Sequence, residues 1–108
     1  MNSDYKEEFP RYDDVLPTLK GFSDSSWHND ACPSLMKHID ELGTFIQIFC
    51  DYKDQEQSDY ADITENYHRF NIMLANAEAD WSIALFESNS WEDIKDYLAR
   101  FNIGGDYL

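Results

Sequence analysis

Two segments near the C-terminal end of this 108-residue chain constrain its fold most strongly. Residues 68–77 and 80–87 each alternate in side-chain character with the period of two that a β-strand has. One set of alternate positions is Phe70, Ile72 and Leu74 in the first segment, and Trp81, Ile83 and Leu85 in the second. The linking residues 77–80 are few enough for a hairpin, so the sequence predicts two antiparallel neighbours here.

A second hairpin is predicted in residues 34–53. Alternation and β-branched residues in 44–53 indicate a strand that is apolar on much of both faces, with Ile46 and Ile48 on one face and Phe45 and Phe49 on the other. The preceding residues 34–42 fit either a strand or a helix. The Gly-ended turn at 40–43 slightly favours the strand.

Two helices complete the predicted fold. Ser90 and Asp93 resemble a capping box, and the positions after them form an apolar stripe at helical spacing, namely Trp91, Ile94, Tyr97, Leu98 and Phe101. A short helix is predicted over 11–21, with Pro17 as a warning against it, and residues 1–9 are expected to be frayed. We therefore expect one α+β domain over 1–108, an antiparallel sheet of three to four strands with a short N-terminal helix and a C-terminal helix packed on one face.

The charge balance restricts the partners that the protein can bind. Eight Lys and Arg against 22 Asp and Glu give a formal net charge of −14. Direct binding to nucleic acid or to an anionic membrane is disfavoured, because those partners are themselves negative. No apolar signal region or membrane span stands out, so we expect a cytoplasmic protein with Cys32 and Cys50 as free thiols.

The window SWHNDACPS, residues 26–34, carries the densest chemistry in the chain. His28, Cys32 and the later His38 suggest zinc, but structural zinc sites need four ligands in tight pairs. Cys32 has no nucleophile signature around it. A capped, proline-locked turn that carries Trp27 and Cys32 into the core is the favoured interpretation, and a partner-contact loop carrying Trp27 is the alternative. We expect no catalytic residue, metal or cofactor.

Acidic residues and tyrosines concentrate in residues 51–66. On an extended strand, carboxylates at i and i+2 lie roughly 6.6 Å apart, close to the interval between neighbouring phosphates of a nucleic-acid strand. This stretch is either a solvated loop or a surface for a basic protein. The predicted partner-binding residues are Asp51, Asp54, Glu56, Asp59, Tyr60, Asp62 and Glu65, supported by Asp13 and Asp14.

In size, net charge and absence of a catalytic motif, the chain resembles the small acidic inhibitors of phages and plasmids, of the anti-CRISPR and anti-restriction type, and the acidic immunity proteins that block nucleases. No family motif covers the chain, so no functional residue is carried over. Together with the charge and the carboxylate spacing, the resemblance implies a non-enzymatic inhibitor in the cytoplasm of a bacterial host cell. It would be monomeric or weakly dimeric and would mimic nucleic acid in the basic groove of a bacterial defence nuclease or CRISPR effector. The alternative is a structural or regulatory interaction module whose acidity only confers solubility.

Overall fold

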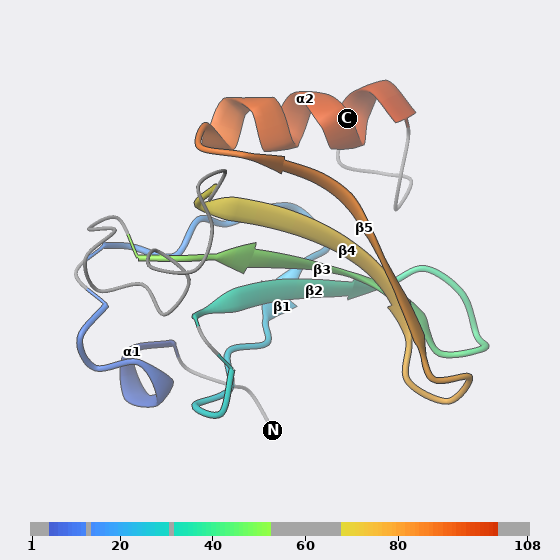
Figure 1. Cartoon of the computed structure of the whole chain (residues 1–108), viewed down its shortest axis with the longest axis horizontal. Coiled ribbons are helices and arrows are strands. Elements are labelled where there is room, and N and C mark those ends of the chain that lie inside the picture. Colours follow the sequence, from blue (N-terminus) through green and yellow to red (C-terminus); the bar gives the residue numbers. More distant parts are fainter. Residues whose placement is uncertain (1–4, 13, 31, 53–67, 102–108) are drawn as a thin grey trace.

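The fold is a five-stranded antiparallel sheet with a helix on one face (Figure 1). The structure is a computed structural model that describes residues 5–12, 14–30, 32–52 and 68–101. In chain order the elements are α1 (Tyr5–Glu8), β1 (Ser23–Asp24), β2 (Ser34–His38), β3 (Thr44–Cys50), β4 (Phe70–Asn76), β5 (Trp81–Ser88) and α2 (Trp91–Phe101). The predicted α+β class is confirmed, with five strands rather than three to four.

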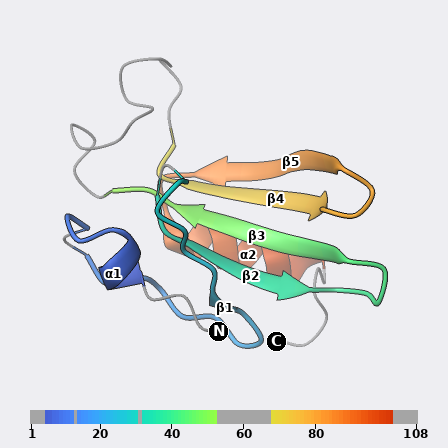
Figure 2. The same cartoon turned by 90° about the horizontal axis from the view of Figure 1, so that it is seen from below.

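The sheet follows the order β1-β2-β3-β4-β5, and every neighbouring pair is antiparallel. Both predicted hairpins are therefore confirmed, and residues 34–38 form a strand. The additional strand, β1, has only two residues, which is too short for alternation to reveal it. Because the strands follow one another in an up-and-down order, the β2–β3 and β4–β5 turns lie at the same end of the sheet (Figures 1 and 2).

Helix α2 covers the sheet face that carries the apolar core. Ile94 and Leu98 are fully buried against core residues of β3 and β4, which include Ile46, Ile48, Cys50, Phe70 and Ile72. The Tyr97 ring stacks on Phe86 of β5, with ring centroids 4.7 Å apart. In Figure 2 the helix lies behind the sheet, so the viewer looks at the opposite face.

The N-terminal region differs from its prediction. The helix is α1, and residues 14–19 are not helical. Leu16 packs in the main core, whereas Tyr12 packs in a second cluster with Phe9 and Tyr52. The segment therefore connects two clusters and does not form a helix with one buried face. The expectation that residues 1–9 are frayed is wrong for 5–9, because Phe9 is buried.

Candidate functional site

Asp51, one of the residues predicted to contact a partner, lies in the interior. It is 1% exposed, and its Oδ1 accepts a hydrogen bond from the Tyr52 amide at 2.7 Å. Its backbone carbonyl accepts hydrogen bonds from Arg69 Nε at 2.9 Å and from the Tyr12 hydroxyl at 3.4 Å. The prediction of a surface contact is therefore wrong for Asp51, because it directly follows β3, whose last residue, Cys50, lies in the core.

Asp14, the second described residue of the predicted set, is paired within the molecule. Its Oδ2 lies 2.7 Å from Nη2 of Arg69, and both side chains are partly exposed. The same guanidinium group donates to the Tyr12 hydroxyl at 3.3 Å. Asp14 thus helps to hold the N-terminal segment against the start of β4. The remaining predicted residues lie outside the described ranges, and they are Asp13, Asp54, Glu56, Asp59, Tyr60, Asp62 and Glu65.

The SWHNDACPS window is a loop closed by serine hydrogen bonds at its two ends. Ser26 and Ser34 are fully buried, and the Ser26 hydroxyl accepts a hydrogen bond from the Ser34 amide at 3.2 Å. Cys32 is buried as predicted. Trp27 is 50% exposed, so the prediction that it fills the core is wrong. Serine hydrogen bonds close the loop, so burial of the Trp27 side chain is not required.

The histidine of this window pairs with a carboxylate of the N-terminal helix. His28 contacts Glu8 of α1, with 3.0 Å between Nδ1 and Oε1, and this contact ties the loop to the N-terminal helix. Within the described residues, no group of three or more His, Cys, Asp or Glu could hold a metal ion. Burial raises the pKa of the Cys50 thiol to about 12, which opposes thiolate formation.

A different surface gathers exposed acidic and apolar side chains at the turn end of the sheet. We define the turn-end surface by its exposed residues, namely Asp40, Glu41 and Leu42 of the β2–β3 turn, Glu78 and Asp80 of the β4–β5 turn, and Trp81 and Ile83 of β5. Neither turn contains a Lys or Arg. Leu42 is 74% exposed, Ile83 54% and Trp81 40%. Exposed large apolar side chains among charged ones are typical of protein-binding surfaces.

Asn76, at the end of β4, fixes the two turns to each other. Its Nδ2 donates to the Leu42 carbonyl at 3.0 Å and to the Thr44 hydroxyl at 3.1 Å. Its Oδ1 accepts from the Ala79 amide at 2.9 Å. The side chain is buried, so these bonds are shielded from water. The turn-end surface is consequently held on a rigid frame.

Hydrogen bonds within the β2–β3 turn stabilise the charged form of Asp40. Oδ1 of Asp40 accepts from the amides of Thr44 at 3.0 Å and Leu42 at 2.9 Å. The Thr44 bonds, and to a smaller extent the Leu42 bond, hold the pKa of Asp40 below its usual value. Gly43 has a φ of 90°, and a side chain added there would lie against Glu78. The backbone of the turn thus stabilises the negative charge of Asp40.

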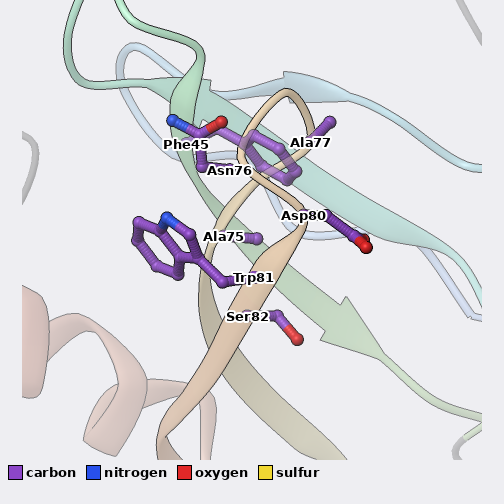
Figure 3. A pocket seen from close by; sticks show the side chains of 7 residues that line it. All are labelled: Phe45, Ala75, Asn76, Ala77, Asp80, Trp81 and Ser82. Carbon is purple, nitrogen blue, oxygen red and sulfur yellow. The ribbon is translucent and has the colours of Figure 1, made fainter.

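A hollow of about 210 Å³ opens beside these turns (Figure 3). Phe45, Ala75 and Ser82 are cross-strand neighbours on β3, β4 and β5, and the two small residues next to the large ring leave the space. Trp81 and Ser82 point to opposite sides of β5 in Figure 3, as successive strand residues do. The other residues lining the hollow are Asn76, Ala77, Asp80 and Trp81.

The turn-end surface was not predicted, although the sequence carries a signal for it. Both predicted hairpin turns contain two acidic residues, at 40–41 and at 78 and 80. Consecutive hairpins in an up-and-down sheet place alternate turns at the same end. The acidic turns and the up-and-down order, taken together, bring the four carboxylates to one end of the sheet.

No protein-family model matches the chain, and no curated protein or solved structure is significantly similar to it. Among the described residues, no helix is long and apolar enough to cross a membrane.

Proposed function

We propose that the protein is a non-enzymatic inhibitor that binds a basic surface of another protein and blocks it. The partner class that suits it is a nucleic-acid-binding groove, as in a bacterial nuclease or CRISPR effector. The turn-end surface carries the proposal, because exposed carboxylates and exposed apolar side chains lie together there on a rigid frame. The net charge of −14 would steer encounter with a basic groove.

The division of labour at this surface follows from its chemistry. Carboxylates on the two turns take the place of phosphates and pair with Lys and Arg of the partner. Trp81 and Leu42 supply apolar contact area, and Trp is one of the residue types enriched at the energetic centre of interfaces. The rigid frame lowers the entropy lost on binding, because Asn76 already fixes both turns.

A competition assay tests this function. The protein is titrated into complexes of a labelled oligonucleotide with a panel of purified bacterial nucleases and CRISPR effectors at low salt. We expect it to displace the oligonucleotide from at least one of them. The triple variant Glu41→Gln/Glu78→Gln/Asp80→Asn should weaken displacement by roughly tenfold or more, because three surface charges are lost from one contact area. Asn at position 80 suits the φ of 58° found there.

The matched control neutralises three carboxylates elsewhere, Glu7→Gln/Glu92→Gln/Asp96→Asn, which are also exposed. Equal weakening by both triple variants would show that net charge alone matters, and displacement by neither the native protein nor the variants would refute the function. A quadruple neutralisation of Asp54, Glu56, Asp59 and Asp62 tests the contacts predicted from the sequence. Unaltered displacement by that variant would remove those four residues from the interface.

The exposed start of β5 favours a second candidate function, that of a module which dimerises through its sheet edge. Trp81 and Ile83 are exposed on the last strand of the sheet. Sedimentation measurements over a range of protein concentrations separate the two functions. The inhibitor is monomeric or at most weakly dimeric in the absence of its partner, whereas the module forms dimers that dominate as the concentration rises.

A further inference from the structure

The two edges of the sheet are unequal. β1 forms one edge with two residues, and β5 forms the other with eight. The outer side of an edge strand presents backbone amide and carbonyl groups that another strand can pair with. In the described part of the chain, no strand pairs with the outer side of β5. Of the two edge strands in the described part of the chain, β5 is the longer and offers the longer run for a further strand.

The first half of β5 lacks the features that usually protect an edge. Residues 81–86 contain no charged residue and no Pro. Residues 81–84 are exposed in succession, so both faces of the strand are accessible there. The register irregularity with β4 falls opposite Ile72 and Met73, beyond this exposed half. Helix α2 contacts Phe86, and the hairpin bends away from the helix toward its turn (Figure 1).

Charge decides which kind of strand fits this edge. Glu78 and Asp80 precede β5, and Glu87 lies near its end, all three exposed. A second copy of the chain would bring −14 against −14. An extended segment bearing Lys or Arg meets the opposite charge at both ends of the strand.

Resting on the proposed function, we propose that an extended, basic segment of the partner protein pairs with the outer edge of β5 and extends the sheet by one strand. Backbone hydrogen bonds to β5 give affinity, and alternate side chains give specificity. Side chains of the segment on the face of Ser82 lie next to that residue, which lines the edge of the hollow nearest the added strand. The flanking carboxylates receive the cationic side chains.

Synthetic peptides of about eight residues, the length of β5, test this proposal. The probe alternates Lys and Val, and the charge control alternates Glu and Val. Two further probes carry the Lys–Val sequence with backbone N-methylation at every Lys or at every Val. Because only alternate residues of an added strand face β5, one methylation pattern should abolish binding and the other should spare it. Binding and amide hydrogen exchange are followed by NMR on isotope-labelled protein.

We expect the Lys–Val peptide to bind, to slow exchange of amides in 81–88, and to bind at least tenfold more tightly than the Glu–Val peptide. Ile83→Lys places a like charge on the edge and should weaken binding by roughly tenfold. Val15→Lys makes the same charge change at an exposed apolar residue in the N-terminal segment, and it should change binding less than about twofold.

Each contrary result has a distinct meaning. Lys–Val binding that leaves residues 81–88 unprotected, or that both methylation patterns affect equally, overturns the strand pairing and leaves the basic partner in place. Equal binding of the Lys and Glu peptides overturns both proposals. Failure of the Lys–Val peptide to bind overturns the edge site, and so does a dimer of the protein alone that Ile83→Lys dissociates.

Discussion

At the scale of single residues, Asn76 organises the candidate surface more than any charged side chain does. Its one amide group joins the carbonyl of Leu42, the hydroxyl of Thr44 and the amide of Ala79. A buried side chain that satisfies three backbone or hydroxyl partners leaves all three unsatisfied when it is removed. The geometry of both turns therefore depends on it.

Asn76→Ala should lower the free energy of unfolding by about 2 kcal/mol, because buried hydrogen-bonding groups lose their partner. Urea denaturation measures the change. The matched control is Asn71→Ala on the same strand, where the side chain is partly buried and donates to the His68 carbonyl at 3.2 Å. An effect of Asn76→Ala no larger than that of the control would contradict the role of Asn76 as the link between the turns.

Cys50 predicts how stability responds to alkaline pH. Burial raises the pKa of its thiol from 9.0 to about 12. The unfolded chain therefore releases this proton near pH 9 while the folded protein keeps it, and the stability that this group contributes below pH 9 is lost as the pH rises toward 12. Burial also raises the pKa of Tyr12 in spite of its hydrogen bond from Arg69.

Urea denaturation of the native protein and of Cys50→Val at about pH 8 and about pH 11 isolates this effect. The native protein should lose more stability over that interval than the variant, which has no thiol at position 50. Parallel losses in the two proteins would show that the buried thiol does not titrate differently in the folded and unfolded states.

Individual exposures were the hardest feature to predict. The sequence correctly predicts that Cys32 is buried. It also predicts a buried Trp27, but Trp27 is exposed beside His28. Asp51 shows the opposite error, because acidity suggested solvent and the end of β3 places the residue in the interior. Both errors arise because the burial of a single residue depends on which distant segments of the chain pack against it. Local composition does not reveal those segments.

At the scale of elements, α2 is the helix that the sequence predicts best. Its start after Ser90 is confirmed, and Ile94 and Leu98 of the predicted apolar stripe are fully buried. The contact of Asp93 with Ser90 that a capping box implies is replaced by another one. The Asp93 carboxylate accepts a hydrogen bond from the Ser88 hydroxyl at 2.8 Å. Strands β3 and β4 were predictable for the same reason as α2, namely that one buried face imposes a regular period.

Leu98→Ala should cost about 3 kcal/mol of stability, because it opens a cavity where α2 meets the sheet. Urea denaturation gives the value, and Lys95→Ala on the partly exposed side of the same helix is the control, expected within about 0.5 kcal/mol of the native protein. A cost below about 1 kcal/mol for Leu98→Ala would mean that α2 packs only loosely on the sheet.

The segment between α1 and β1 shows where periodicity fails. Tyr12, Leu16 and Leu19 have helical spacing, yet Tyr12 packs in one cluster and the two leucines in another. Val15, also part of the pattern, is exposed. Spacing predicts a helix only when the apolar residues share one surface to cover, and here the chain connects two.

At the scale of the whole molecule, charge and topology act together. The sequence alone gives the net charge of −14 and the preference for a basic partner. It could not locate the turn-end surface directly, because Asp40 and Asp80 come from turns far apart in the chain and only the strand order brings the turns to one end. The exposed edge of β5 likewise follows from strand order and from the extent of α2.

The central claim is that the turn-end surface recognises a basic protein. The most direct test is the rate at which the protein associates with a nuclease from which it displaces nucleic acid. Stopped-flow fluorescence measures this rate at about 50 mM and about 500 mM salt. We predict that the rate for the native protein falls by about tenfold or more, because salt screens the attraction between opposite charges. The Glu41→Gln/Glu78→Gln/Asp80→Asn variant should show a clearly shallower fall. A rate that does not change with salt, or an equal fall for both proteins, would contradict the claim.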